Sequence, residues 1–215
     1  MTPLRREWLI WGLVIAVALT LFIVYRLEQP EHITPISVFV IIESTVTVMG
    51  IVYALFIGFA WHYRFFKGWL VRVPDVRGTW KGSILPLDAS GTSLASVPCQ
   101  LVIRQKLFSI NCVLHTRGAR SQSFAGNAFV DEDSGEERLV YAYRGIPRLA
   151  DRRTNPSHEG TAVLVLKERD RLAGTYFTDR CTRGEIALIL FSRKTNIPFA
   201  PDDEGSDRDV RRSAS

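Results

Sequence analysis

Aromatic, hydroxyl and guanidinium side chains alternate along two short segments in the second half of the chain. Tyr141 and Tyr143 share one face of an extended segment, because successive side chains of a strand point to opposite faces. By the same rule, Tyr176, Thr178 and Arg180 share one face of a second segment. This combination suits a nucleotide, since a base stacks on an aromatic ring with about 1 to 3 kcal/mol and arginine binds phosphate through two parallel hydrogen bonds.

Three further residues complete the candidate set. Trp80 offers another aromatic plane and Arg183 another guanidinium group, while His158 stands just before a predicted strand and can reach over a ligand. The candidate ligand-binding residues are therefore Trp80, Tyr141, Tyr143, His158, Tyr176, Thr178, Arg180 and Arg183.

A purely structural interpretation of the same residues stays open. Tyr and Trp are ordinary residues of β-barrel interiors. Arg180 can be a surface charge at the end of a strand, or it can stack on Trp80 as a structural cap. His158 can equally be a turn residue that is bonded to backbone groups.

Catalysis has no support in the sequence. Nucleophile-elbow, P-loop, HExxH and dinucleotide-binding motifs are absent. The three cysteines, Cys99, Cys112 and Cys181, show neither a CxxC pair nor metal-ligand spacing. We therefore expect reduced, buried thiols, no metal, no cofactor and no enzyme activity.

The region from Pro74 onward predicts an all-β domain that positions these residues. Short apolar or alternating segments separated by Gly, Pro, Asp and Asn are typical of strands and turns. Eight strands are predicted, over residues 77–87, 99–105, 107–116, 121–130, 137–144, 160–167, 172–180 and 184–193. The short turns favour an antiparallel up-and-down meander, and its closure removes exposed sheet edges. We therefore expect residues 74–197 to form a lipocalin-like, eight-stranded barrel, which is wide enough for one small ligand.

Two segments of the β-rich region lie outside the predicted strands. The loop Gly145–Glu159 carries three arginines and two prolines, and it is a candidate lid over the barrel mouth. Residues 198–215 mix charges with small residues and are expected to be a disordered tail.

Two apolar stretches precede the β-rich region. Residues 8–25 carry no charge, and residues 36–63 are also long enough to span a bilayer, which takes about 20 residues. We predict that residues 1–73 form a hairpin of two transmembrane helices, in preference to a signal peptide, for which no small-residue cleavage site follows. Basic residues flank the outer ends of both stretches, so the positive-inside rule places both termini in the cytoplasm and the short turn in the periplasm.

One face of the second helix carries a polar and small-residue stripe: Glu43, Thr47, Gly50, Ala54 and Gly58. An ionisable residue at this depth is costly and usually faces protein or water. Small residues at four-residue steps allow helix backbones to approach closely. Two interpretations stay open: the stripe packs on the first helix within one hairpin, or it faces other copies in an oligomer.

The overall charge fits an anionic partner. The chain has 215 residues and a formal net charge of +5, which suits phosphates or a lipid headgroup surface. We expect no DNA or RNA partner.

The order of these features resembles one known family. Two N-terminal membrane helices are followed by GTWKG at 78–82, LVYAYR at 139–144, His158 two residues before Gly160, and LAGTYFTDRCTRGEIAL at 172–188. This order is similar to that of the two-transmembrane, β-strand-rich effectors that accompany CD-NTase nucleotidyltransferases in bacterial CBASS anti-phage systems. The resemblance spans residues 8–195.

The resemblance implies a function for both parts of the chain. A cytoplasmic barrel binds a cyclic dinucleotide or oligonucleotide made by a CD-NTase-type synthase, and the candidate residues above form the ligand face. Binding drives homo-oligomeric assembly of the helices in the lipid of the bacterial inner membrane, as a multi-pass protein. The membrane is disrupted and the infected cell dies. The sequence does not specify which cyclic nucleotide is bound.

Two other classes of protein remain open at this point. A membrane-tethered, lipocalin-like carrier needs an apolar cavity with its arginines pointing outward. A structural membrane-assembly protein needs a barrel interior that is filled by side chains.

Overall fold

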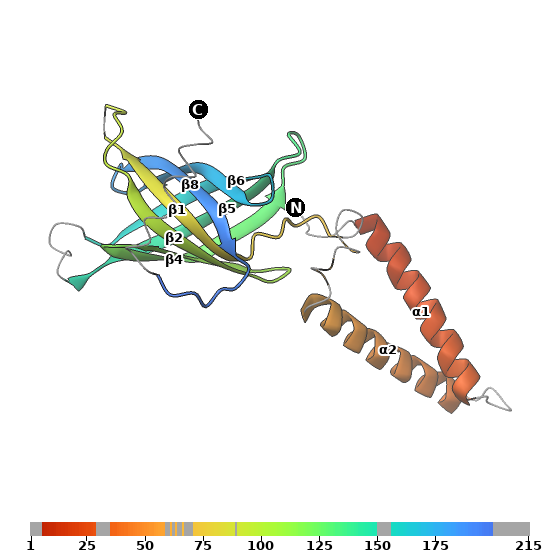
Figure 1. Ribbon diagram of the computed structural model, residues 1–215. Coiled ribbons are helices and arrows are strands. Elements are labelled where there is room, and N and C mark those ends of the chain that lie inside the picture. Colours follow the sequence, from red (N-terminus) through yellow and green to blue (C-terminus); the bar gives the residue numbers. More distant parts are fainter. Residues whose placement is uncertain are drawn as a thin grey trace. The chain divides into compact units, whose positions relative to one another are not determined.

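The computed structural model describes residues 6–28, 35–58, 61, 63, 66, 71–88, 90–149 and 156–199. The chain divides into two compact units between Val73 and Pro74. The first unit contains helices, and the second contains strands (Figure 1).

Both apolar stretches are helical. Helix α1 covers Arg6–Glu28 and helix α2 covers Pro35–Gly58. The second helix was expected to reach residue 63 but ends at Gly58, a residue type that is unfavourable within helices and common at their ends. By length and composition, Val38–Gly58 qualifies as one candidate membrane span among the described residues, whereas the apolar part of α1, Val14–Ile23, is shorter. The hairpin and its membrane insertion stay predictions.

The polar and small-residue stripe of α2 is exposed in this structure. All five of its residues are exposed, and no described atom lies within 4 Å of the position that a Cβ would take at Gly50 or Gly58. The Thr47 hydroxyl donates to the backbone carbonyl of Glu43 at 2.9 Å, so its hydrogen bond is made within the helix. Better-covered side chains of α2, such as Thr45 and Met49, lie on the other side of the helix.

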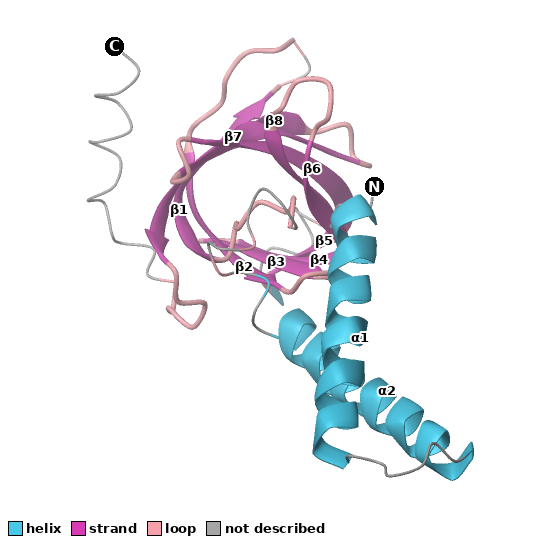
Figure 2. Ribbon diagram, turned by 90° about the vertical axis from the view of Figure 1, so that its right-hand side faces the viewer, coloured by secondary structure: helices cyan, strands magenta, loops and turns pink. Residues whose placement is uncertain are grey.

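The second unit is a closed antiparallel barrel. Its strands are β1 (Gly78–Leu87), β2 (Val97–Gln105), β3 (Ile110–Thr116), β4 (Ala119–Val130), β5 (Glu137–Pro147), β6 (His158–Lys167), β7 (Arg171–Thr178) and β8 (Arg183–Ser192). Each strand pairs with the next along the chain, and β8 pairs with β1 (Figure 2). The prediction of eight antiparallel strands in a closed up-and-down barrel is confirmed.

One end of the barrel interior is packed with large apolar side chains. Trp80, Leu101, Ile103, Leu139, Leu164, Leu172 and Leu188 are each no more than 2% exposed. These residues come from the start of the odd-numbered strands and the end of the even-numbered ones. The indole Nε1 of Trp80 donates to the Val76 carbonyl at 2.9 Å, so even its polar atom is satisfied. We call this half of the interior the packed end.

The chain segment that leads into β1 closes the packed end. Gln105 accepts a hydrogen bond from the Val76 N–H at 3.0 Å and donates one from Nε2 to the Pro74 carbonyl at 2.8 Å. Arg193, just after β8, donates from Nη1 to the carbonyls of Asp75 and Arg77, both at 3.0 Å. The two ends of the barrel sequence are therefore bonded to each other.

The segment after β8 continues across the outer face of β1, β2 and β3. The Thr79 hydroxyl donates to the Lys194 carbonyl at 2.6 Å, and Nε2 of Gln100 donates to the Ile197 carbonyl at 3.0 Å. Phe199 stacks on His115 with 6.1 Å between ring centroids. Phe199, at the start of the expected tail, thus contacts the barrel. Residues 200–215 lie outside the described part, and the disordered tail stays a prediction.

Two further expectations need correction. The loop after β5 is shorter than Gly145–Glu159, since β5 extends to Pro147 and β6 begins at His158; residues 150–155 of the proposed lid lie outside the described residues. Cys99 and Cys112 are free and buried as expected, and burial raises the pKa of each thiol to about 12. Cys181 is exposed instead, because it occupies the turn between β7 and β8 rather than a strand interior.

Candidate functional site

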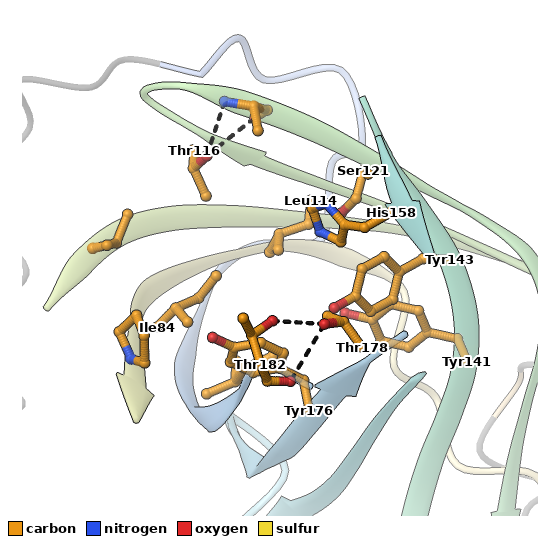
Figure 3. A pocket seen from close by; sticks show the side chains of 15 residues that line it. Ile84, Leu114, Thr116, Ser121, Tyr141, Tyr143, His158, Tyr176, Thr178 and Thr182 are labelled. Carbon is orange, nitrogen blue, oxygen red and sulfur yellow. Dashed lines mark hydrogen bonds between the residues drawn. The ribbon is translucent and has the colours of Figure 1, made fainter. Parts of the chain in front are cut away.

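The end of the barrel opposite the packed end is hollow. It contains a cavity of about 200 Å³. The cavity is lined by Ile84, Pro86, Val97, Leu114, Thr116, Ala119, Ser121, Tyr141, Tyr143, Gly145, His158, Tyr176, Thr178, Thr182 and Ile186 (Figure 3). We call this end the mouth.

The up-and-down topology determines which residues reach the mouth. Odd-numbered strands end there and even-numbered strands begin there. Inward positions near these ends therefore line the cavity, although they are separated by many residues in sequence. Tyr141, Tyr143 and Gly145 all line the cavity because they lie at alternate positions of β5.

Three aromatic rings from β5 and β6 form one wall of the cavity. The ring centroids of Tyr141 and Tyr143 are 5.8 Å apart with a 48° angle between planes. Tyr143 and His158 meet edge to face, with centroids 6.5 Å apart and an interplanar angle of 83°. Both separations fall in the usual range for aromatic pairs, so the rings support one another and still present apolar surface to the cavity.

The phenol groups keep their hydrogen-bonding capacity for a ligand. The hydroxyls of Tyr141, Tyr143 and Tyr176 make no hydrogen bond with another described residue, and Figure 3 shows all three side chains at the cavity. Burial is the main cause that raises the pKa of each of the three phenols above the ordinary value. Each hydroxyl therefore stays protonated and can donate as well as accept.

A tight turn forms the edge of the mouth between β7 and β8. The hydroxyls of Thr178 and Thr182 are 2.6 Å apart, and the Thr178 N–H donates to the Thr182 carbonyl at 2.9 Å. Cys181 takes a left-handed conformation with φ of 58°, which completes the reversal of the chain. Arg180 in this turn donates from Nη1 to the Pro156 carbonyl at 3.2 Å, so it joins two segments of the mouth.

The structure brings together five of the eight candidate residues. Tyr141, Tyr143, His158, Tyr176 and Thr178 line the cavity. Their role in ligand binding stays a prediction.

The other three candidate residues lie elsewhere. Trp80 is fully buried at the packed end, so it neither lines the cavity nor stacks on Arg180. Arg180 does not continue the face of Tyr176 and Thr178, because β7 ends at Thr178 and the turn changes the direction of the chain. Arg183 starts β8 as an exposed residue, and its neighbour Gly184 takes the inward position.

Sequence reasoning missed several residues of the cavity. Thr116, Ser121 and Thr182 contribute hydroxyl groups, and Ile84 and Leu114 contribute apolar surface. Alternation within the strands assigns most of them to the inner face. The missing information was which end of the barrel is hollow, because that depends on the side chains of all eight strands together.

Arginines cluster in the turns around the mouth. Arg117 lies between the cavity residues Thr116 and Ala119, and Arg148 directly follows β5 and donates its N–H to the Gly118 carbonyl at 3.1 Å. Arg180 and Arg183 flank the cavity residue Thr182. These four arginines place positive charge in the turns beside the opening of the cavity.

A closed eight-stranded barrel with one packed end and one hollow, aromatic-lined end belongs to the class of small-ligand-binding barrels. Residues 71–189 match the family model of the Cap15 cyclic dinucleotide receptor domain. The match includes β1 to β7, most of β8 and every residue that lines the cavity.

The chain therefore belongs to the Cap15 cyclic dinucleotide receptor family, in agreement with its resemblance to CBASS effectors. A curated relative, CD-NTase-associated protein 15 of Staphylococcus schleiferi, is 26% identical over 149 residues. These residues make up 69% of this chain and 78% of the relative.

The unbonded phenol at Tyr141 leads to a stability prediction. Replacing Tyr141 with Phe removes a hydroxyl that has no described protein partner, so we expect the free energy of unfolding to stay within about 0.5 kcal/mol of wild type or to rise. Thermal unfolding of the purified chain, monitored by near-UV circular dichroism, measures this change. Trp80→Phe is the matched control, because loss of its bond to Val76 is expected to destabilise the barrel by about 1 to 3 kcal/mol. A large loss of stability for Tyr141→Phe contradicts the conclusion that its hydroxyl has no partner among the described residues.

Proposed function

We propose that the chain is a CBASS effector whose barrel senses a cyclic dinucleotide, made by a CD-NTase-type synthase, and whose helices act on the bacterial inner membrane. The observation that carries the proposal is the tyrosine-lined cavity inside the region that matches a cyclic dinucleotide receptor family. The barrel acts as a sensor and carries out no catalysis.

The size of the cavity supports a specific mode of binding. Ligand pockets usually measure about 300 to 1,000 Å³, whereas this cavity measures about 200 Å³. We infer that one base enters between the aromatic rings and that the rest of the ligand lies at the mouth. The unpaired phenols then bond to the edge of the inserted base, and this bonding sets base preference.

The phosphates of the ligand then lie beside the turns that carry Arg117, Arg148, Arg180 and Arg183. A guanidinium group can bind a phosphate through two parallel hydrogen bonds. Since these arginines lie outside the cavity lining, they act on the charged part of the ligand while the rings act on the base.

Ligand binding by this site is tested with two substitutions. Tyr176→Ala removes one stacking surface and is expected to weaken binding of cyclic dinucleotides by about 1 to 3 kcal/mol. Arg180→Gln is expected to weaken binding and to reduce its dependence on salt, because one phosphate contact is lost. Calorimetry with the purified chain at two salt concentrations measures both effects.

Arg171→Gln is the matched control for Arg180→Gln, because Arg171 is exposed at the packed end. Equal effects of the two arginine substitutions contradict phosphate binding at the mouth.

The apolar part of the lining, including Ile84, Leu114 and Ile186, favours a lipocalin-like carrier as the second candidate. That candidate is adopted if a fatty acid stabilises the chain against heat and no cyclic dinucleotide does.

The helical unit is proposed to insert in the inner membrane as a hairpin with both termini in the cytoplasm. The distribution of basic residues supports this orientation. A cytoplasmic barrel has direct access to a second messenger that is made inside the cell.

Cys181 provides a native reporter of this orientation. It is exposed, whereas Cys99 and Cys112 are buried and have a raised pKa, so only Cys181 should react readily with a maleimide. A membrane-impermeant maleimide is expected to label the chain in lysed spheroplasts and to leave it unlabelled in intact ones. Cys181→Ser should abolish the labelling of lysed spheroplasts and leave intact spheroplasts unlabelled. Labelling of intact spheroplasts contradicts the cytoplasmic orientation.

The polar and small-residue stripe is proposed as the surface through which copies assemble after ligand binding. Its exposure supports contact with other copies over packing within one hairpin. Assembly along this face brings Glu43 and the Thr47 hydroxyl to the seam between helices. We infer that such polar seams disrupt the membrane and cause the death of the infected cell.

Crosslinking distinguishes assembly from simple anchoring. In the Cys181→Ser background, Ala54→Cys on the stripe is expected to form disulfide-linked dimers that increase several-fold when a cyclic dinucleotide is added. Val52→Cys is the control, because Val52 is similarly exposed but lies on the opposite side of α2. Equal crosslinking at both positions, or crosslinking that is independent of ligand, contradicts assembly through the stripe.

A further inference from the structure

Each of the four aromatic residues of the cavity is paired with a glycine on the neighbouring strand. Tyr141 pairs with Gly126, Tyr143 with Gly160, His158 with Gly145, and Tyr176 with Gly184. A ring that leans over a glycine of the adjacent strand covers backbone that no side chain covers, an arrangement that stabilises glycine within sheets. At Gly160, Gly145 and Gly184, the absence of a Cβ also leaves the partner ring room to lie close to the barrel wall.

Strands β5 and β6 make this arrangement reciprocal. Tyr143 of β5 lies over Gly160 of β6, where an added Cβ would be 2.7 Å from the phenol oxygen. His158 of β6 lies over Gly145 of β5, where an added Cβ would be 2.7 Å from both Cε1 and Nε2 of the imidazole. Ordinary van der Waals contact begins at 3.4 Å, so each glycine occupies a place that no other residue type can take without moving the ring.

Gly145 differs from the other glycines in what a side chain would meet. At two of the other glycines an added Cβ would also meet a backbone carbonyl oxygen. The Phe177 oxygen would be 2.7 Å from a Cβ at Gly160, and the Leu85 oxygen would be 2.4 Å from a Cβ at Gly184. At Gly145 the three nearest atoms all belong to the His158 ring. A methyl group at position 145 therefore displaces this ring and leaves the strands in place.

The displaced ring has limited space. Tyr143 lies on one side of it, and its Nδ1 is 3.4 Å from the Pro156 carbonyl. Towards the barrel interior, the open volume next to the ring is the cavity, which is lined by both His158 and Gly145. Moving the imidazole into about 200 Å³ of free space reduces the room that is left for a base.

We propose that Gly145 is a specificity-determining residue: it seats the His158 ring against the barrel wall and thereby sets the size of the base that the cavity accepts. This inference rests on the proposed function, because it assumes that a base enters the cavity. Gly145 has no side chain to offer the ligand, so its proposed effect on specificity is through the position of the ring. The glycine at 145 thus leaves the most room for a base, and a larger residue there is expected to penalise the larger purine bases more than the smaller pyrimidine bases.

The test compares Gly145→Ala in the wild-type chain and in a His158→Ala background. In the wild-type chain, G145A is expected to lower the affinity for a cyclic dinucleotide of two purines roughly tenfold, about 1.4 kcal/mol, and to change the affinity for one of two pyrimidines by less than about threefold. In the His158→Ala background, G145A is expected to change neither affinity, because the ring that it displaces is gone. An equal loss in both backgrounds, or an equal loss for both ligands, overturns the proposal.

A ligand-independent measurement separates this proposal from the proposed function. The ring signal of His158, identified by its loss in His158→Ala, is expected to shift in the NMR spectrum of histidine-labelled G145A. An unmoved signal overturns the proposal that Gly145 sets the position of the ring. If the wild-type chain binds neither cyclic dinucleotide, the proposed function fails and the specificity role with it, while the shift still reports the contact of ring and glycine. If G145A fails to fold, recovery of folding in the double variant with His158→Ala supports the contact between Gly145 and the ring. Failure to recover overturns the proposal.

Discussion

The pairing of β1 with β8 is the constraint on which the rest of the barrel depends. It runs from Thr79 to Leu87 on β1 and joins the first strand of the sheet to the last. Without it, two strands would expose unpaired backbone groups, which invite aggregation, and the inward faces of all eight strands would lose their common interior. The bonds of Arg193 to the carbonyls of Asp75 and Arg77 lie beside this seam and hold the two ends of the sheet together.

Closure of the sheet creates one interior for all eight strands. The distribution of side-chain volume then divides this interior into a packed end and a hollow mouth. The packed end holds a tryptophan and several leucines in dry contact, so its stability does not depend on a ligand. The mouth can stay hollow because the packed end supplies the apolar burial that a small barrel needs. This division explains why Trp80 and Tyr141, both inward-facing aromatic residues, have different roles: one is satisfied by the Val76 carbonyl, and the other keeps its hydroxyl free of described protein partners.

The local sequence pattern was sufficient to predict the strands but insufficient to predict all residues of the cavity. All eight strands were predicted, because alternation and turn residues are local signals; β3 begins later than expected because the apolar residues Leu107 and Phe108 belong to a turn. The rings of Tyr141, Tyr143 and Tyr176 were found by the same alternation. Arg180 was misplaced because alternation was extended beyond Thr178 into a turn with a left-handed residue. Trp80 was misplaced for a different reason. Alternation predicts whether a side chain points into the barrel, but only the closed topology shows at which end of the interior it lies.

The position of the cavity constrains how a ligand can affect the helices. The chain leads from α2 into β1 through Pro74 to Arg77, and these residues are bonded to Gln105 and Arg193 at the packed end. A base inserted at the mouth, as proposed, would touch the opposite half of the interior. A signal that passes through the barrel must therefore travel along the strands or through rigid layers of packed side chains, which deform little. Under the proposed function, a ligand that recruited a second copy directly at the mouth turns would make such transmission unnecessary. In that case the barrel wall would serve as a rigid frame, and the helices of the proposed effector would respond to the local concentration of copies rather than to a change of shape.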